Sequence, residues 1–222
     1  MSSTVKALVF DVYGTMFDVL SISEACEEKF PGKGEEVGKT WHSKQMEYLF
    51  LHQLMGKYIP FSEVTKEALR FSVKEHAEEE LDAAEEQGLF EAFLRLAPYP
   101  EVADMLGQLK GKELSVFSNG SHNMLDPLVE NAGYTSFFSG IISVDEIKQF
   151  KPSLYSYQYL LNKIGLKHEE VLFVSSNNWD VAGAKNFGFQ TAWINRKKQT
   201  VDELGLDPDF IFDDLTGLLK WK

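Results

Sequence analysis

Cysteine is nearly absent from the sequence, with Cys26 the one residue of this type among 222. A single thiol excludes an internal disulfide framework and suits a reducing compartment, so we expect a cytoplasmic protein. Cys26 lies in a stretch of helical character, far from other candidate ligand side chains. We therefore interpret it as a small packed residue.

Long apolar runs and a basic leader are lacking too, so we expect neither a membrane span nor a signal peptide. Basic residues are outnumbered: 34 Asp and Glu stand against 22 Lys and Arg, for a formal charge of -12. This balance argues against nucleic acid or an anionic membrane as a main partner. It still allows an anionic small-molecule substrate, because one lysine can dominate inside a pocket.

From Pro100 onward, helical patterns alternate with short apolar runs. Strands are expected at 113–117, 140–144, 170–174, 190–194 and 210–212. Helices are expected between them, at 101–110, 125–132, 153–164 and 181–187. Alternation of this kind predicts an α/β fold with a doubly wound, mainly parallel sheet.

Residues 19–97 show helical spacing and no convincing strand. Helices are expected at 23–30, at 35–55, from Ser62 as the N-cap of a third helix, and at 78–96. We therefore predict an all-helical cap of residues 19–97, inserted into a core domain of residues 1–18 plus 98–222.

The first apolar run, 5–10, ends in Asp11, and Gly14 then allows a tight turn. Because ligands of open α/β sheets bind outside the carboxyl ends of the strands, Asp11 is a candidate catalytic carboxylate. The alternative is that Asp11 merely ends the strand or caps the turn.

Polar side chains follow three later strands or turns. Ser118 and Asn119 offer a hydroxyl and an amide suited to an anion, or else to capping the next helix. Lys151 precedes a proline, which favours an extended backbone; it is a partner for Asp11 or an ordinary exposed lysine. The stretch 175–180 ends in Asp180, which either activates a water molecule or caps a helix.

In this order, the motifs Asp11-Val-Tyr-Gly-Thr15, Ser118-Asn119-Gly120, Lys151-Pro152 and 175–180 resemble the haloacid dehalogenase superfamily. Within it, the chain resembles the (S)-2-haloacid dehalogenases over essentially its whole length. The resemblance implies metal-independent hydrolysis of small (S)-2-haloacids, with fluoroacetate among the candidates, to inverted 2-hydroxy acids. It implies no cofactor, with the haloacid and water as the small-molecule partners.

The resemblance also assigns roles to individual residues. Asp11 attacks C2 of the substrate to form an ester, Asp180 activates the water that hydrolyses it, and Lys151 keeps Asp11 ionised. Thr15 is expected to bond an Asp11 oxygen. The remaining family positions are Ser118 and Asn119 for the substrate carboxylate, Ser175 and Asn177 to orient Lys151, Asp180 or the water, Tyr157 as a further active-site residue, and Tyr13, Met46, Phe61 and Trp179 as apolar lining.

A magnesium-dependent phosphatase of the same superfamily is the alternative. Phosphatases place a general acid two positions after the nucleophile, where this chain has Tyr13, a phenol with a reference pKa of about 10. Their acidic magnesium ligands correspond here to a stretch that begins Ser175-Ser176-Asn177. A halide leaving group needs no proton, so the loss of the general acid favours dehalogenation. The loss of the acidic ligands favours a reaction without a metal site.

His42 departs from the family, which has an arginine at this cap position to receive the halide. Histidine is shorter and only partly charged at neutral pH, whereas arginine is always charged. Three interpretations stay open: a tighter pocket for fluoride or chloride, a slower enzyme that gains activity at lower pH, or a different substrate. His42 as a plain exposed cap residue is a fourth.

A non-enzymatic interaction protein would not need Asp11, Lys151 and Asp180 together, although His42 keeps that class open. Tyr48, Phe50 and Leu51 lie close together in the cap and suggest the surface of a homodimer; core packing explains them equally well.

Overall fold

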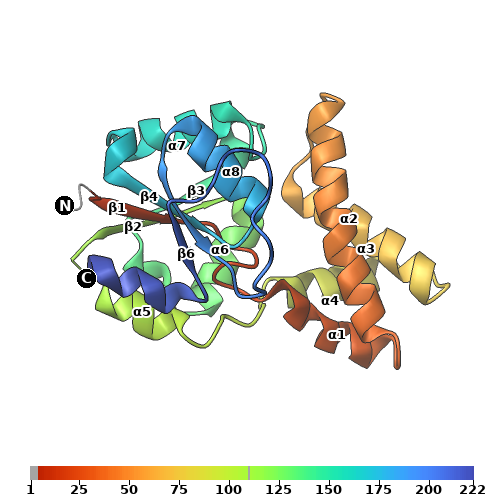
Figure 1. Cartoon of the computed structure of the whole chain (residues 1–222). Helices are drawn as coiled ribbons and strands as arrows, with labels where there is room; N and C mark the ends of the chain where they lie inside the picture. The colour runs from red at the N-terminus through yellow and green to blue at the C-terminus, as the bar shows by residue number, and fades with distance from the viewer. Residues whose placement is uncertain (1–4, 110) are drawn as a thin grey trace.

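The computed structural model describes residues 5–109 and 111–222, in which six parallel strands form one sheet with the order β3-β2-β1-β4-β5-β6 (Figure 1). The strands are β1 (Ala7–Phe10), β2 (Glu113–Ser118), β3 (Gly140–Ser143), β4 (Val171–Ser175), β5 (Gln190–Ile194) and β6 (Phe210–Phe212). The register sets Phe10 at the end of β1 beside Val116 and Val174. The predicted α/β fold with a parallel sheet is confirmed.

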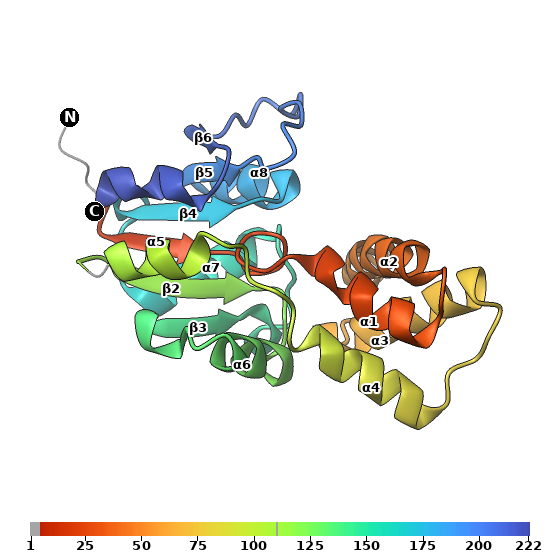
Figure 2. The same ribbon diagram turned by 90° about the horizontal axis from the view of Figure 1, so that it is seen from below.

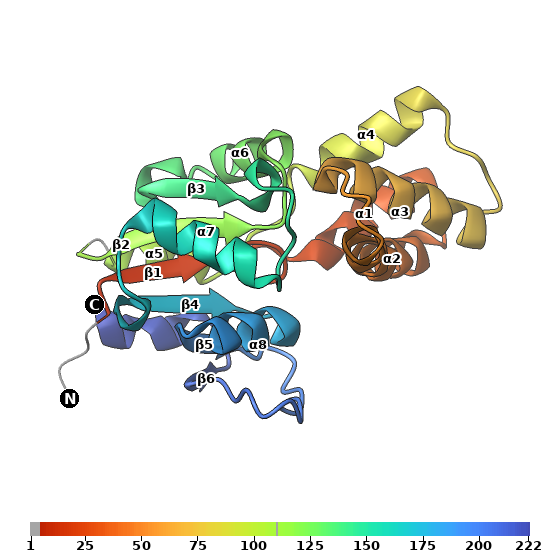
Figure 3. The ribbon, with the colours of Figure 1, turned by 90° about the horizontal axis from the view of Figure 1, so that it is seen from above.

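Helices cover both faces of this sheet. They are α5 (Val102–Gln108), α6 (His122–Asn131), α7 (Leu154–Ile164) and α8 (Asn178–Phe187), with short 3-10 segments η2 (Thr135–Phe137), η3 (Val144–Glu146), η4 (His168–Glu170) and η5 (Leu215–Trp221). Helices α5 and η5 contact each other on one face, and α7 and α8 on the other (Figures 2 and 3). Strand β1 is buried at all four positions, as expected of a parallel strand between two helical layers.

The remaining helices form a cap beyond the carboxyl ends of the strands (Figure 1). They are η1 (Val19–Ser21), α1 (Ile22–Lys29), α2 (Gly34–Leu54), α3 (Phe61–His76) and α4 (Ala83–Phe93). The two connections to the core run side by side, since the Asp18 N–H donates to the Ala97 carbonyl at 2.8 Å. The cap boundaries at residues 19 and 97 stay a prediction.

The cap also contacts the core at its far end. Tyr58 donates to the Asp145 carboxylate at 2.5 Å, and the Gln53 side chain accepts the Phe150 N–H at 2.7 Å. Phe50 packs edge-on against Trp179, with ring centroids 5.5 Å apart. The cap is thus closed over the strand tips at several independent points.

Several predicted helix ends are wrong. Ser62 is not an N-cap: Pro60 holds that position, and Ser62 is buried in the first turn of α3. Helix α4 is shorter than 78–96, because Asp82 forms a capping box with Glu85 that fixes its start at Ala83.

Two core helices begin earlier than predicted. Helix α6 begins at His122 rather than 125, because Met124 and Leu125 pack into the core from its first turns. Helix α8 begins at Asn178 rather than 181, which places Asp180 inside its first turn. The predicted end of the 101–110 helix at Lys110 lies outside the described residues; α5 ends at Gln108.

Cys26 is buried in α1, and burial raises the pKa of its thiol to about 12, so its prediction as a packed residue is confirmed. Across the residues described, no helix combines the length and apolar character that crossing a bilayer requires.

Candidate active site

Asp11 directly follows β1, at the centre of the sheet. Its N–H donates to the Val174 carbonyl of β4 at 2.9 Å, which continues the ladder by one residue and fixes the backbone. The chain then reverses through Gly14, whose φ of +81° lies in the left-handed region. A Cβ on Gly14 would lie 3.1 Å from the Ser176 hydroxyl, so this turn has both a conformational and a steric reason for glycine.

Three side chains donate hydrogen bonds to one oxygen of Asp11, Oδ2. Thr15 Oγ1 donates at 2.9 Å, Asn177 Nδ2 at 2.9 Å and Ser175 Oγ at 3.3 Å. The predicted contact of Thr15 with Asp11 is confirmed. Ser175 and Asn177 were expected to orient Lys151, Asp180 or water, and their side chains instead donate to Asp11. Asn177 is the N-cap residue of α8, yet its amide turns away from that helix to Asp11.

Lys151 lies between two carboxylates. Its Nζ donates to Asp11 Oδ1 at 2.9 Å and to Asp180 Oδ2 at 2.6 Å, and it also contacts the Phe117 carbonyl at 3.2 Å. The lysine is fully buried, so the alternative of an exposed loop residue is excluded. Burial by itself would lower the pKa of Lys151, but Asp11 and Asp180 outweigh burial and raise it. Lys151 is therefore charged at neutral pH.

Asp180 is fully buried in the first turn of α8 and accepts hydrogen bonds from Lys151 and Tyr157. Burial raises the pKa of Asp180 to about 6, against the opposing effect of Lys151. A carboxylate that titrates near 6 is suited to take a proton from water at neutral pH. The capping alternative for Asp180 is excluded, because its side chain contacts Lys151 and Tyr157 rather than the helix end.

Tyr157 is fully buried beneath this group and does not line the cavity at Asp11. Its hydroxyl donates to Asp180 Oδ1 at 2.8 Å. Burial raises the pKa of Tyr157, and the Asp180 charge adds to the effect, so the phenol stays a donor. In this structure Tyr157 contacts Asp180 and not the cavity; its role in binding substrate stays a prediction.

A small cavity of about 20 Å³ lies between Asp11 and the cap. Its wall contains the predicted lining residues Tyr13, Met46, Phe61 and Trp179, together with His42, Ser118, Asn119 and Asn177. Tyr13 also packs against Phe61, and burial raises the pKa of its phenol. The space holds little more than a water molecule, so a ligand must be small and must displace lining side chains or open the cap.

Ser118 and Asn119 line this cavity while they also support its frame. The Ser118 hydroxyl accepts the Gly120 N–H at 3.1 Å. The Asn119 side-chain oxygen, Oδ1, accepts the backbone N–H of Lys151 at 2.8 Å. The side-chain NH₂ of Asn119 is thus the donor that a ligand can use. Neither side chain caps α6, whose N-cap is Ser121.

His42 lies on α2, in the wall of the cavity, so the interpretation of an uninvolved exposed residue is excluded. Its Nδ1 is inaccessible to solvent and has no hydrogen-bond partner in the described part of the chain. Burial lowers the pKa of His42, and the nearby Lys197 lowers it further. The imidazole is therefore neutral at pH 7.

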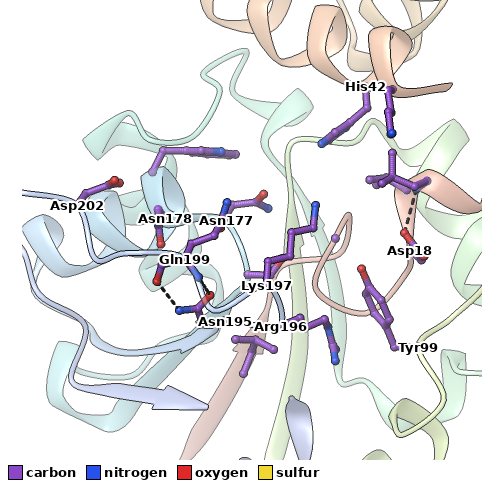
Figure 4. A pocket seen from close by; sticks show the side chains of 17 residues that line it. Asp18, His42, Tyr99, Asn177, Asn178, Asn195, Arg196, Lys197, Gln199 and Asp202 are labelled. Carbon is purple, nitrogen blue, oxygen red and sulfur yellow. Dashed lines mark hydrogen bonds between the residues drawn. The ribbon is translucent and has the colours of Figure 1, made fainter. Parts of the chain in front are cut away.

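An open cleft of about 590 Å³ adjoins the cavity on its outer side (Figure 4). His42, Asn177 and Trp179 line both spaces. The rest of the cleft wall includes polar residues of the β5–β6 loop, among them Asn195, Arg196 and Lys197.

Gln45 and Leu49 line the cavity and were not assigned a role from the sequence. Gln45 is buried and donates to the Thr65 hydroxyl at 2.7 Å. A signal existed, since His42, Gln45 and Leu49 are spaced three and four residues apart on α2 and so share a helix face.

A family model described as haloacid dehalogenase-like hydrolase matches residues 5–188. A curated (S)-2-haloacid dehalogenase of Pseudomonas sp. (strain YL) is 42% identical, over 97% of this chain and 94% of the relative. Haloacetate dehalogenase H-2 of Moraxella sp. (strain B) is 43% identical, over 93% of this chain and 92% of the relative.

A solved structure is similar over nearly the whole fold. It is the L-2-haloacid dehalogenase from Xanthobacter autotrophicus with chloropropionic acid covalently bound, and it aligns with a TM-score of 0.92 at 39% identity. The alignment covers 97% of each chain.

Proposed function

We propose a reaction for this chain from one premise: the chain belongs to the haloacid dehalogenase-like hydrolases and, within them, to the (S)-2-haloacid dehalogenases. It hydrolyses small (S)-2-haloacids to halide and the 2-hydroxy acid of inverted configuration. The observation that carries the proposal is Asp11, a buried carboxylate with ordered donors that faces a small, largely apolar cavity.

In the first step, an Asp11 oxygen attacks C2 of the haloacid opposite the halogen. A carbon–oxygen bond forms, the carbon–halogen bond breaks, and the halide leaves with the electron pair. Oδ1 is the better nucleophile, because in the described part of the chain it accepts a hydrogen bond from Lys151 alone, whereas Oδ2 accepts three. The apolar walls limit hydration of the attacking carboxylate.

In the second step, Asp180 takes a proton from a water molecule that attacks the Asp11 carbonyl carbon of the ester. The tetrahedral intermediate places negative charge on Oδ2, where Thr15, Ser175 and Asn177 already donate. The ester bond to Asp11 then breaks, and the proton goes to the departing 2-hydroxy acid. Tyr157 holds Asp180 in place for this step.

The substrate carboxylate lies near Ser118 and Asn119 in this scheme, and the halide leaves on the side of His42. A neutral His42 donates at most one hydrogen bond to the halide, which favours a small, strongly bonding ion such as fluoride or chloride. Burial lowers the pKa of His42, so protonating it requires acidic pH, and Asp180 takes up its own proton as the pH falls through about 6. A gain of activity at lower pH is therefore opposed by loss of the base.

A phosphatase is disfavoured by the chemistry beside Asp11. Tyr13 follows it at the general-acid position, and burial raises the pKa of that phenol. The second carboxylate, Asp180, is already paired with the Lys151 ammonium, which neutralises the negative charge that would otherwise attract a divalent metal ion.

We further propose a cytoplasmic homodimer. Leu51, Leu54 and Met55 are exposed near the end of α2 and offer an apolar surface for a second copy. Of the side chains expected there, Tyr48 and Phe50 are partly buried, against Phe71 and Trp179 respectively. Light scattering on the purified protein tests the assembly; a monomer at all concentrations would reject it.

The test of function is halide release from both enantiomers of 2-chloropropionate and from fluoroacetate, with and without EDTA. Asp11→Asn is the control, with its mass checked so that reversion to Asp is detected. Metal-independent release from the (S)-acid or fluoroacetate is expected. No release, together with magnesium-dependent cleavage of p-nitrophenyl phosphate, would replace the dehalogenase by the phosphatase.

A further inference from the structure

The charges around Asp11 leave an arriving anion without a free cation. Lys151 is shared by Asp11 and Asp180, so the three groups together are net negative when both carboxylates are ionised. The substrate adds a carboxylate and the first step adds a halide, and like charges at this range repel strongly in a buried site. His42 does not answer this charge while its imidazole is neutral.

A cation that attracts the substrate anion can act from the open cleft. It shares His42, Asn177 and Trp179 with the cavity, so these three side chains separate solvent from the space at Asp11. An anion that enters or leaves past them passes through the cleft.

Two of the cations in the cleft wall are already paired. Arg196 forms an ion pair with Glu101 at 2.6 Å, donates to the Thr15 carbonyl at 3.0 Å and stacks on Tyr99. Lys39 forms an ion pair with Glu35. Lys197 has no hydrogen-bond or ion-pair partner in residues 5–109 and 111–222, and it is close enough to His42 to lower its pKa.

The loop that carries Lys197 is fixed by its own hydrogen bonds. The Asn195 side chain accepts the Gln199 N–H and donates to the Gln199 carbonyl, both at 2.8 Å. Figure 4 shows the Lys197 side chain extending from this turn toward the cap that carries His42. The cleft wall also contains two acidic residues, Asp18 and Asp202, and neither forms an ion pair with Lys197 among the described residues.

We propose that Lys197 binds the haloacid carboxylate on entry and the halide on exit, and thereby supplies in the cleft the positive charge that His42 does not supply in the cavity. The inference rests on the proposed function and names a substrate-binding residue for it. Because Lys197 acts outside the cavity, it affects capture and release of anions more than the bond-breaking steps.

Turnover tests this directly with Lys197→Gln and, as a matched control, Lys198→Gln. Lys198 is exposed on the same loop but does not line the cleft. For (S)-2-chloropropionate at low ionic strength, Lys197→Gln should lower kcat/KM by about tenfold, mainly through KM, and Lys198→Gln by less than about twofold. Sodium sulfate should shrink the difference, since charges beyond about 10 Å are screened at 0.1 M.

A binding measurement separates this inference from the proposed function. Iodide quenches tryptophan fluorescence on contact, and Trp179, at the cleft, is the most exposed of the four tryptophans; Trp41, Trp193 and Trp221 are buried. Lys197→Gln should weaken quenching by iodide but leave quenching by neutral acrylamide unchanged. Lys198→Gln should change neither.

The outcomes are distinct. Equal kcat/KM and equal iodide quenching in the two lysine variants would overturn the role of Lys197, even in an active dehalogenase. A wild-type protein without halide release but with iodide quenching dependent on Lys197 would refute the proposed function and leave the anion site standing. In a His42→Arg background, the effect of Lys197→Gln should fall below about twofold, because arginine then carries the charge.

Discussion

Replacing Asp180 by asparagine should stop the reaction halfway. The variant keeps the shape of the side chain, and Lys151 keeps Asp11 as its partner at 2.9 Å. The first step therefore proceeds, and the halide leaves. The second step loses its base, which typically costs about 10² to 10⁴ in rate. The ester on Asp11 should accumulate.

The fold should survive this change because its partners can rearrange. The asparagine carbonyl oxygen can accept from Lys151, while its NH₂ donates to the Tyr157 oxygen. The Tyr157 hydroxyl already lies 3.1 Å from the carbonyl of residue 180 and can donate there. Losing one charged hydrogen-bond acceptor costs about 1.5–3 kcal/mol, or a fall in Tm of about 3 to 12 °C for a chain of this size.

The assay follows halide by rapid quench and the protein by intact mass. Asp180→Asn should release one halide per chain in a burst and gain one carboxyethyl ester group on the Asp11 peptide. Asp209→Asn is the control, because Asp209 forms its ion pair with Lys185, at 2.6 Å, outside the active site. This variant should keep full turnover. Wild-type turnover by Asp180→Asn, or loss of the burst in a folded variant, would refute the assignment.

Three further predictions concern the halide side, the oxyanion side and pH. His42→Arg should raise kcat for chloro and bromo substrates by about tenfold and shift preference away from fluoride; unchanged rates across the halogens would exclude His42 as the halide contact. Thr15→Val should lower kcat by about 10² through the loss of one donor to Oδ2, measured as steady-state halide release; an unaffected kcat would remove Thr15 from the mechanism. The hydrolytic step should slow as pH falls through about 6, where Asp180 takes up its proton. The folded-state pKa of Asp180 lies above the unfolded value of about 4. The contribution of Asp180 to the free energy of unfolding should therefore decrease as the pH rises from 4 to 6, and denaturant titrations of Asp180→Asn should lack this pH dependence.

Much of the fold follows from the sequence because its strands are short runs of apolar residues that end in distinctive polar groups. Asp11 directly follows β1 and Ser175 ends the adjacent parallel strand β4, so the register of the two strands brings these residues together. The ends of the helices are harder to predict from the sequence. The start of α4 depends on Asp82 and Glu85 acting together, and acidic residues throughout 78–86 mask that pair.

The site residues could be found, but not all of their contacts. The sequence does not show which way the Asn177 amide turns, because both the α8 N-terminus and Asp11 are within its reach. No local pattern in the sequence marks Lys197 as a site residue. Its position near His42 depends on how a loop packs against a helix more than 150 residues away in the chain, since the two residues are numbers 197 and 42. Such a pairing is set by how the cap closes on the core.

The central claim is that Asp11 forms the covalent ester and that water attacks Asp11 rather than C2. A single turnover of excess enzyme with (S)-2-chloropropionate in water labelled with heavy oxygen tests it most directly. The account predicts that the label enters the Asp11 peptide and that the 2-hydroxy acid carries ordinary oxygen from Asp11 at C2. Label in the product after one turnover, with none in the Asp11 peptide, would mean that water displaces the halide directly and would contradict the account.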